Sequence, residues 1–395
     1  MIPYGRQNIS QDDINHVIKI LKSDFLTQGE VVPLFEKKIA KKVGAKYGVA
    51  VNSATSALHI SCLALGLEPG DILWTSPITF VASANCGLYC GAKVDFVDID
   101  PITNNICPKK LEEKLILAEH FGQLPKILVA VHLSGQSCQM QKIYNLSKQY
   151  GFKVIEDASH AIGGKYKSAY IGSCEYSDIT VFSFHPVKII TTGEGGMAMT
   201  NKHDLAEKME RLRSHGITRN EKKMTHPSDG PWYYQQIDLG FNYRMTEIQA
   251  ALGLSQINRL DEFVLKRNII SDNYNFEFEN LPLSVPTHYP ECYSARHLYI
   301  IRLDLTKINK THNQVFKEFL AMGIGVNIHY IPVHLQPFYQ KFGFKNGDFP
   351  EAEKFYESAI TLPLYPDLSL EQQEIVINSA KSILGSIHDQ DIKIA

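Results

Sequence analysis

The sequence predicts an α/β protein with a large domain, built on a mainly parallel sheet between two layers of helices, and a smaller α+β domain at the C-terminus. The chain of 395 residues is long enough to bury two hydrophobic cores. Apolar runs typical of buried strands alternate with helical stretches through the first part of the chain, which favours parallel pairing. This alternation ends near Thr246, so we predict a large domain over residues 1–250 and a small one over residues 251–395.

A helix and a polar loop precede the predicted sheet. Residues 10–22 form a helix in this prediction because Ser10 can cap its N-terminus and its apolar side chains fall on one face. The loop at residues 24–29 is too polar for a core, and a second helix is predicted over residues 32–43.

Apolar runs then mark the strands of the large domain. They lie at residues 47–51, 72–76, 93–97, 127–132, 153–156, 179–184 and 196–200. Helices are predicted between several of these strands, at residues 108–121 and 140–150. In the C-terminal part the pattern predicts a long helical stretch, an alternating strand, a helix, an apolar strand and a last helix, at residues 247–278, 297–303, 311–322, 324–330 and 370–384.

Composition and charge limit the possible functions. Hydrophobic residues make up 44% and charged residues 21% of the chain, as in ordinary soluble globular proteins. The formal net charge is −2 and no basic run is present, so we do not expect binding to nucleic acid. No apolar stretch approaches the roughly 20 residues of a membrane span, and the polar N-terminus does not resemble a signal peptide. We therefore expect a cytoplasmic protein that does not bind membranes.

The seven cysteines are scattered along the chain and do not form a metal motif. Cys86 and Cys90 stand four positions apart, but no second pair and no spaced histidines complete a zinc site. We interpret the cysteines as structural thiols of a reducing compartment, and we expect no metal.

Two polar residues follow neighbouring buried strands. Asp157 comes directly after the strand at residues 153–156, and Lys188 follows the next strand at residues 179–184. Taken singly, the aspartate could be a helix N-cap and the lysine a solvated loop residue. Their positions at successive strand ends of an open α/β sheet, with the glycines of residues 191–196 beside the lysine, instead favour a shared binding site.

Pyridoxal 5′-phosphate (PLP) needs four things from a protein: a lysine, a carboxylate, an anion site and a flat wall against its ring. Two further features of the sequence supply the anion site and the wall. Residues 52–56 stand where a strand turns into a helix, and the backbone N–H groups of a helix N-terminus bind phosphate. Phe80 also follows a strand and could stack on the cofactor ring, although an aromatic residue at such a position is more often part of a core.

Together these segments resemble the DegT/DnrJ/EryC1/StrS family of sugar aminotransferases, over essentially the whole chain. The most specific matches are NSATSALH (52–59), SPITFVASAN (76–85), EDASHAIGG (156–164), FSFHPVKIITTGEGG (182–196) and LGFNYRMTEIQAALGLSQ (239–256). The resemblance implies a fold-type I PLP-dependent aminotransferase, with a large α/β/α domain and a small C-terminal domain.

Matched position by position, the family pattern implies a role for each candidate cofactor residue. Lys188 would bind PLP as a Schiff base and move protons, and Asp157 would pair with the pyridine nitrogen. His160 would lie near the ring, and Phe80 would stack on it where many relatives carry tryptophan. The phosphate would be held by Ala54, Thr55 and Ser183 of one chain and by Asn242 of its neighbour. The role of Asn242 at the phosphate of a neighbouring chain implies a homodimer with shared active sites.

Within the family, the likeness is to members that aminate a UDP-linked keto-sugar. It rests on IPYGRQ (2–7), LTQG (26–29), RLRSHGITR (211–219), GPWYYQQ (230–236) and GIGVNIHYIPVHLQPFY (323–339). It implies transfer of the amino group of L-glutamate to the C4 keto group of the sugar. Part of the N-terminal segment 1–30 and a later segment would contact this substrate, through Tyr4, Asp24, Phe25, Leu26, Thr27, Asn327, Ile328, His329 and Tyr330.

Other activities remain open at this stage. Residue chemistry does not distinguish amination at C3 from amination at C4, so another nucleotide-linked 3- or 4-keto-sugar is an alternative substrate. A sugar dehydratase of the same family would carry histidine in place of Lys188, and a non-enzymatic PLP-binding regulator would not need Asp157 and Lys188 intact. A dehydrogenase is disfavoured because no G-x-G-x-x-G motif opens a helix after a strand.

Overall fold

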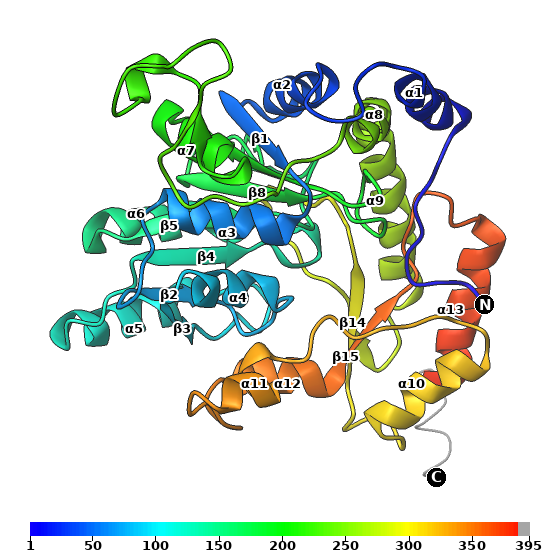
Figure 1. Cartoon of the computed structure of the whole chain (residues 1–395). Coiled ribbons are helices and arrows are strands. Elements are labelled where there is room, and N and C mark those ends of the chain that lie inside the picture. Colours follow the sequence, from blue (N-terminus) through cyan, green and yellow to red (C-terminus); the bar gives the residue numbers. More distant parts are fainter. Residues whose placement is uncertain (386–395) are drawn as a thin grey trace, which may run out of the picture.

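A seven-stranded sheet forms the centre of the larger, N-terminal part of the protein (Figure 1). The computed structural model describes residues 1–385. The strand order is β1-β9-β8-β5-β4-β2-β3. The strands of this sheet are β1 (Tyr47–Val51), β2 (Ile72–Thr75), β3 (Lys93–Phe96), β4 (Ile127–Val131), β5 (Lys153–Asp157), β8 (Ile179–Ser183) and β9 (Gly196–Thr200).

The direction of the strands brings several strand ends to one edge of the sheet. The pairs β2–β3, β2–β4, β4–β5 and β5–β8 are parallel, whereas β9 runs antiparallel to both β8 and β1. β1 therefore points in the same direction as β8. The carboxyl ends of β1, β2, β5 and β8 lie at the same edge, where Gly196 at the start of β9 pairs with Val51 and Ser183. The prediction of a mainly parallel sheet is confirmed.

Helices cover both faces of the sheet. Successive residues of a strand point to opposite faces, so in β4 Val129 joins the core on one side and Leu128 the core on the other. One face packs against α3 (Ala54–Ala64), α4 (Ala82–Tyr89) and α7 (His203–Arg213). The other face packs against α2 (Val31–Val43), α5 (Pro108–His120), α6 (Met140–Tyr150), α8 (Glu247–Gln256) and α9 (Leu260–Glu277). This arrangement confirms the predicted three-layer α/β/α architecture.

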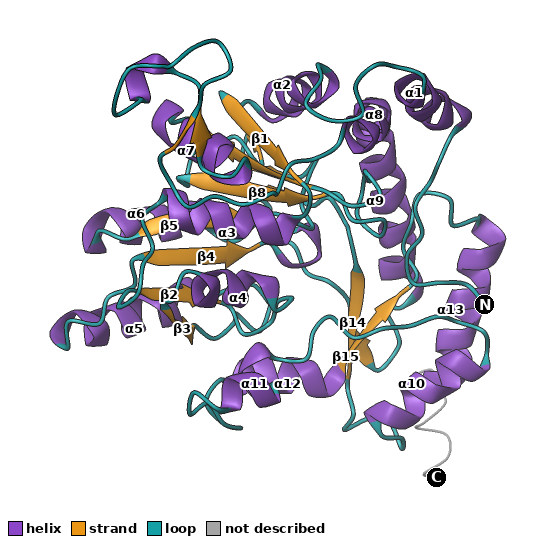
Figure 2. Ribbon diagram, in the orientation of Figure 1, coloured by secondary structure: helices purple, strands orange, loops and turns teal. Residues whose placement is uncertain are grey.

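The C-terminal part is built on a small sheet with the order β12-β14-β15. Figure 2 shows its helices beside the orange strands β14 and β15. The core between them includes the buried side chains of Tyr274 and Phe319, together with Ile2 from the N-terminus. The predicted mixture of helices and strands is confirmed, and the division between residues 250 and 251 stays a prediction. The elements of this part are β12 (Leu283–Ser284), β13 (Cys292–Tyr293), β14 (Tyr299–Leu303), β15 (Ala359–Leu362), α10 (His312–Ala321), α11 (Pro337–Gln340), α12 (Pro350–Ser358) and α13 (Leu370–Leu384).

Short elements complete the chain outside these two parts. The N-terminal helix α1 (Gln11–Leu21) packs against α8. A serine cap at Ser10 begins this helix as predicted, and its hydroxyl accepts a hydrogen bond from the N–H of Asp13 (3.3 Å). The two-residue strands are β6 (Lys165–Tyr166), β7 (Ala169–Tyr170), β10 (Ile217–Thr218) and β11 (Gln235–Gln236).

Two predictions of secondary structure need correction. Residues 324–330 do not form a strand, because only isolated bridges to Ile2 and Thr361 are present. The N-terminal segment pairs with the start of this stretch, where the N–H of Gly325 donates to the carbonyl oxygen of Ile2 (2.7 Å) and a Cβ atom at Gly325 would lie 2.9 Å from that oxygen. The helix predicted over residues 247–278 is interrupted by a short 3-10 turn between α8 and α9.

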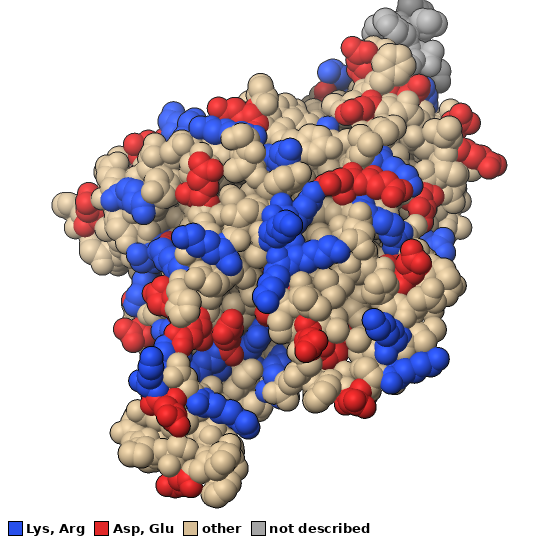
Figure 3. Space-filling view, turned by 90° about the horizontal axis from the view of Figure 1, so that it is seen from above, with Lys and Arg blue, Asp and Glu red and all other residues tan. Residues whose placement is uncertain are grey.

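The surface carries charges of both signs. Figure 3 shows blue basic and red acidic side chains interspersed over the face seen from above. None of the helices within residues 1–385 has the length and hydropathy of a membrane span. In the same part of the chain no group of His, Cys, Asp or Glu side chains is suited to hold a metal ion, and the cysteines are free thiols.

A buried carboxylate connects the N-terminal loop to α8. α2 has no side-chain cap of its own, and Glu247 accepts hydrogen bonds from the N–H groups of Val31 and Val32 (2.7 and 3.3 Å). The N–H of Glu247 itself donates to the carbonyl oxygen of Leu26 (3.0 Å). Glu247 is 1% exposed, so water cannot readily replace its carboxylate at these N–H groups. This carboxylate therefore holds the start of α2 and the loop before it against α8.

We predict that Glu247→Ala lowers the apparent free energy of unfolding by about 2–4 kcal/mol, because two buried N–H groups lose their acceptor. Glu247→Gln keeps an acceptor oxygen and is expected to lose less. Urea-induced unfolding of the cofactor-free protein measures the difference. Glu262→Ala is the matched control, since the exposed ion pair of Glu262 with Lys266 contributes only about 0.5 kcal/mol. Equal losses in the Glu247→Ala and Glu262→Ala variants would contradict the capping role.

Candidate active site

The loops that leave the sheet at one edge place most of the predicted cofactor residues together. Phe80 follows β2, Asp157 ends β5, and Lys188 follows β8. Ala54 and Thr55 follow β1 as the first residues of α3. Because these strands point in one direction, segments that are far apart in the sequence meet at this edge, which is where open α/β sheets bind ligands.

Asp157 presents a buried carboxylate with a fixed orientation. The residue is 6% exposed. Its Oδ2 accepts a hydrogen bond from the hydroxyl of Ser83 (2.6 Å), and its Oδ1 accepts from the hydroxyl and the backbone N–H of Ser159 (2.6 and 3.1 Å). The hydroxyl of Ser83 also lies 2.7 Å from that of Thr79. These neutral donors orient the carboxylate and leave its charge available to a cationic partner.

Lys188 lies in a turn in which its backbone N–H donates to the carbonyl oxygen of His185 (2.9 Å). Burial lowers the pKa of its amine to about 8, while the carboxylate of Asp157 acts in the opposite direction. Near neutral pH, the neutral amine is therefore a larger fraction of Lys188 than of an exposed lysine. A neutral amine can act both as a nucleophile and as a base.

His160 is a neutral ring in contact with Tyr330. Burial lowers the pKa of His160 well below its usual value, and the charges of Lys188 and His329 act in the same direction. The backbone N–H of Ser134 donates to Nδ1 (3.3 Å), which assigns the proton to Nε2, and Nε2 lies 3.1 Å from the hydroxyl of Tyr330. The rings of His160 and Tyr330 are stacked at an interplanar angle of 23°. The structure thus joins a predicted cofactor residue to a predicted substrate residue.

The start of α3 offers backbone donors at the same edge. Ser53 caps the helix, since its hydroxyl accepts a hydrogen bond from the N–H of Ser56 (3.1 Å). The N–H groups of Ala54 and Thr55 belong to the first helical turn, in which no intrahelical acceptor is available. A Cβ atom at Gly196 would lie 2.5 Å from the backbone nitrogen of Ala54, so only glycine leaves this space open. The helix N-terminus is suited to an anion such as a phosphate group.

Ser183 and Phe80 also reach this edge. Ser183 is the last residue of β8, and its hydroxyl accepts a long hydrogen bond from the N–H of His185 (3.5 Å). Phe80 is 59% exposed, so it does not belong to a core. Its ring lies 6.2 Å from that of Tyr330. The aromatic ring is therefore available to stack on a ligand.

Predicted substrate residues of two segments lie beside His160. Nδ1 of His329 is 2.8 Å from the hydroxyl of Thr361, and the ring of His329 lies 5.2 Å from that of Tyr4. Burial, with a smaller effect of Lys188, lowers the pKa of His329 to about 3, so this ring is neutral. A wall of neutral polar groups therefore stands next to Lys188.

The other predicted residues are not brought to this cluster within one chain. The side chains of the N-terminal loop and of the segment before α8 are exposed, namely Asp24, Phe25, Leu26, Thr27 and Asn242. Asn327 pairs through its backbone with Thr361, and its side-chain oxygen accepts a hydrogen bond from the N–H of Ile328 (2.8 Å). The predicted residues outside the cluster can fill their roles only if a substrate or a second subunit reaches them.

Several polar residues of the site were not predicted. Ser83 and Ser159 hold Asp157, Ser134 holds His160, and the ring of His297 lies 4.4 Å from that of His160. Ser159 could have been found from the sequence, because an aspartate often bonds to the backbone two residues later in a turn. The others come from distant segments and carry no local signal.

Comparison with known proteins identifies the family. The sequence model of the DegT/DnrJ/EryC1/StrS aminotransferase family matches residues 7–381. The chain belongs to this family. It is 39% identical over 386 residues to the spore coat polysaccharide biosynthesis protein SpsC of Bacillus subtilis, with 97% of each chain covered. It is 38% identical over 389 residues to the UDP-4-amino-4,6-dideoxy-N-acetyl-beta-L-altrosamine transaminase of Campylobacter jejuni, with 98% of each chain covered.

Solved structures of aminotransferases share the whole fold. PseC of Helicobacter pylori, an aminotransferase involved in the biosynthesis of pseudoaminic acid, is 30% identical with a TM-score of 0.88, over 97% of this chain and 99% of that chain. Spr1654 of Streptococcus pneumoniae in its PLP form is 28% identical with a TM-score of 0.86, over 97% of this chain and 98% of that chain. The protein is a PLP-dependent sugar aminotransferase of fold type I.

The residues at the edge of the sheet fit PLP. Asp157 supplies an oriented carboxylate, and Lys188 supplies an amine with a lowered pKa. The start of α3 supplies free N–H groups, which Gly196 leaves accessible, and Phe80 supplies an exposed aromatic ring. These are the groups that a PLP-dependent DegT-family enzyme needs from the protein.

We predict that Lys188 of the cofactor-free protein reacts with an amine-directed acylating reagent with a pH midpoint near 8, because only the neutral amine is nucleophilic. Mass spectrometry of peptides from samples labelled at different pH measures this midpoint. Asp157→Asn is expected to lower it further, since the carboxylate raises the pKa of the amine. Asp178→Asn, which removes a carboxylate that pairs with Lys202, is the matched control. A midpoint near 10.4, as in exposed lysines, would contradict the burial effect.

Proposed function

We propose that this enzyme transfers the amino group of L-glutamate to the C4 keto group of UDP-2-acetamido-2,6-dideoxy-β-L-arabino-hex-4-ulose. The product is UDP-4-amino-4,6-dideoxy-N-acetyl-β-L-altrosamine, an intermediate of pseudaminic acid biosynthesis. The observation that carries the site assignment is the pair of Asp157 and Lys188 at adjacent strand ends, with the pKa of the lysine lowered by burial. The choice of sugar is supported by the similarity to the Campylobacter jejuni transaminase and to PseC.

Lys188 is the proposed catalytic residue. PLP, when bound, withdraws electrons from the carbon that carries the amino group. The neutral Nζ of Lys188 accepts the proton from Cα of L-glutamate, and in the second half of the reaction it returns a proton to C4 of the sugar. Asp157 pairs with the ring nitrogen of the cofactor and keeps it protonated. His160 and Phe80 hold the ring in position.

The remaining proposed contacts divide between phosphate and sugar. Backbone and hydroxyl groups at the ends of β1 and β8 bind the cofactor phosphate, through Ala54, Thr55 and Ser183. Two segments bind the sugar nucleotide, through Tyr4, Asp24, Phe25, Leu26, Thr27, Asn327, Ile328, His329 and Tyr330. The ring and hydrogen-bond contacts of Tyr4, His329 and Tyr330 next to His160 support the second set.

Another nucleotide-linked 3- or 4-keto-sugar is the second candidate substrate. The identity to SpsC is 39% and the identity to the altrosamine transaminase is 38%, so overall similarity does not select between them. A 3-keto-sugar and a 4-keto-sugar would use the same cofactor groups, because the position of amination depends on how the sugar is held against Lys188.

We predict that the purified enzyme with PLP and L-glutamate aminates the proposed keto-sugar, and that NMR of the product places the new amino group at C4. Lys188→Ala is expected to abolish turnover and the covalent attachment of PLP to the protein, because it removes the amine that forms this bond and acts as the base. Lys202→Ala is the matched control, since Lys202 is exposed and pairs with Asp178.

Two results would contradict different parts of the proposal. An enzyme that leaves this sugar unchanged but aminates a 3-keto or differently configured sugar would refute the substrate and keep the site. Undiminished turnover by the Lys188→Ala variant would refute the site.

We also propose that the enzyme acts as a cytoplasmic homodimer whose active sites are shared. Asn242 is exposed and contacts its own chain through a backbone bridge to Ser214, which leaves its side chain available to a partner. Apolar side chains that an interface could cover are exposed on α1 and the loop after it, at Ile14, Ile18, Leu21, Phe25 and Leu26. In a symmetric dimer, Asn242 would reach the cofactor phosphate of the partner subunit.

Hybrid dimers test the shared site. We predict that Asn242→Ala and Lys188→Ala proteins are each strongly impaired, and that unfolding and refolding them as an equal mixture restores about a quarter of the wild-type activity. Half of the dimers are then hybrids, and each hybrid contains one intact site of its two. A mixture that is no more active than the average of the two variants would contradict a site completed by Asn242 of the second subunit.

A further inference from the structure

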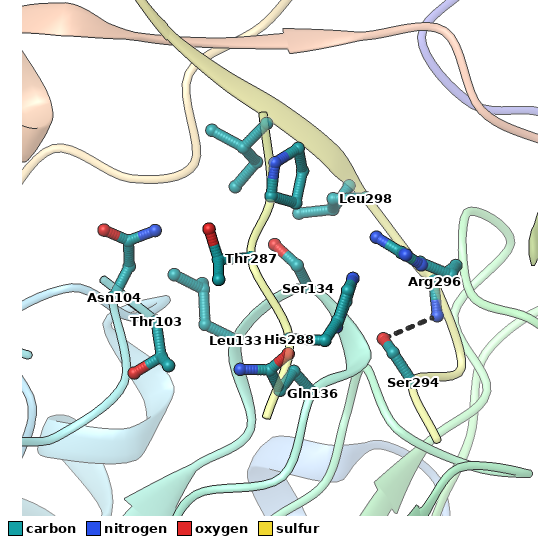
Figure 4. A pocket seen from close by; sticks show the side chains of 12 residues that line it. Thr103, Asn104, Leu133, Ser134, Gln136, Thr287, His288, Ser294, Arg296 and Leu298 are labelled. Atoms are coloured by element: carbon teal, nitrogen blue, oxygen red, sulfur yellow. Dashed lines mark hydrogen bonds between the residues drawn. The ribbon is translucent and has the colours of Figure 1, made fainter. Parts of the chain in front are cut away.

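A second pocket lies between the turn that follows β4 and the segment that leads into β14. Figure 4 shows Thr103 and Asn104 on one side, Ser294 and Arg296 on the other, and His288 and Gln136 between them. The two walls come from parts of the chain that are far apart in sequence. The proposed function makes no use of this pocket.

Buried polar groups that line the pocket have no hydrogen-bond partner within residues 1–385. Both Oε1 and Nε2 of Gln136 are unpaired, although this residue is 4% exposed. Nη1 of Arg296 is also unpaired, and Arg296 is 6% exposed. The same holds for both ring nitrogens of His288. Buried donors and acceptors are almost always satisfied in native proteins, so their concentration around one space indicates that water or a ligand occupies it.

The charge of the pocket comes from Arg296. Its Nη2 lies 3.7 Å from Asp272, a carboxylate whose side chain is 70% exposed and which does not line the pocket. Burial, with a smaller effect of Arg296, lowers the pKa of His288 to about 3, so this ring is neutral and offers one donor and one acceptor. The guanidinium of Arg296 and the neutral side chains of Gln136 and His288 therefore line the pocket, and none of the lining residues is anionic.

We propose that this pocket binds a small monocarboxylate, with Nη1 of Arg296 and Nε2 of Gln136 donating to its oxygens. A guanidinium and an amide that line the same space offer N–H donors to the oxygens of a planar carboxylate. The hydrocarbon part of the ligand packs on the apolar wall of Leu133, Leu298 and Ile300. A phosphate group is disfavoured because a single cationic side chain opposes its higher charge and no long helix begins at the pocket.

The pocket shares a wall with the active site. The N–H of Ser134 donates to Nδ1 of His160 (3.3 Å), while the carbonyl oxygen of Ser134 accepts from the N–H of His297 (2.9 Å). The next residue, Gly135, accepts a hydrogen bond from the N–H of Ala295 (3.0 Å). A ligand that bonds to both Gln136 and Arg296 would hold the turn at residues 134–136 against the segment at residues 295–297. Its binding is therefore expected to stabilise the region around His160.

The test uses the PLP-bound enzyme and acetate as the probe, with binding measured by calorimetry and by the shift of the melting temperature at constant ionic strength. We expect saturable binding of acetate, with weaker binding of phosphate and no specific effect of chloride. Arg296→Gln and Gln136→Leu are each expected to weaken acetate binding at least about tenfold, because each removes a donor to the carboxylate. Arg302→Gln is the matched control, since Arg302 lies on β14 and donates to the carbonyl oxygen of Pro101 outside the pocket.

Three outcomes would overturn the proposal. Acetate that acts no differently from chloride would mean that the pocket holds water only. Tighter binding of phosphate would refute the monocarboxylate class. Unchanged acetate binding in the Gln136→Leu variant would place the acetate elsewhere, including the active site, and this variant decides the question even if the Arg296→Gln protein does not fold. None of these results bears on the proposed sugar aminotransferase reaction, whose test uses Lys188.

Discussion

The active site depends on one geometric constraint, the common direction of β1, β2, β5 and β8. Each of these strands ends at the same edge of the sheet, so a residue that directly follows one strand lies near the residues that follow the others. The reversed strand β9 is essential to this arrangement. It lies between β1 and β8 and runs antiparallel to both, so β1 and β8 point in the same direction. Its first residue, Gly196, also leaves room beside the start of α3.

Burial then determines the charge of the site. Asp157 is a carboxylate held by hydroxyl and N–H donors. Around it, burial lowers the pKa of Lys188, His160 and His329, and the charge of Lys188 lowers the pKa of both histidines further. A site built in this way has a fixed negative charge and a set of neutral polar groups. Such a site suits a cationic ring nitrogen at Asp157 and a base at Lys188.

Interactions outside the site keep its loops in place. Glu36, a buried carboxylate of α2, accepts hydrogen bonds from the N–H of Ala50 (2.8 Å) and from the guanidinium of Arg213, which also donates to the carbonyl oxygen of Ala50 (2.7 Å). These bonds tie β1 to α2 and α7 immediately before the start of α3. Glu247 performs a similar role for the N-terminal loop. Truncating either carboxylate would loosen a segment of the proposed site without touching a ligand.

The elements and chemical groups that depend on a few neighbouring positions could be predicted from the sequence. The bounds of β1, β9, α6 and α13 match the predicted ranges, because hydrophobic periodicity and capping residues act over a few positions. Asp157 and Lys188 could be selected because each directly follows a buried strand. The family motifs identified the enzyme class, and Ser159 had a local turn signal that could have been used.

Features that depend on distant segments followed from the packing of the fold and could not be predicted. Residues 324–330 form isolated bridges to Ile2 and Thr361, which are distant in the sequence, instead of the predicted strand. The hydroxyl of Ser83 on Asp157, the N–H of Ser134 on His160, and the shared pocket of Gln136 and Arg296 each join positions with no periodic relation in the sequence. Periodicity reports which side of an element is buried. It does not report which other element covers that side, and this is why the partners of the site residues emerged from the packed fold.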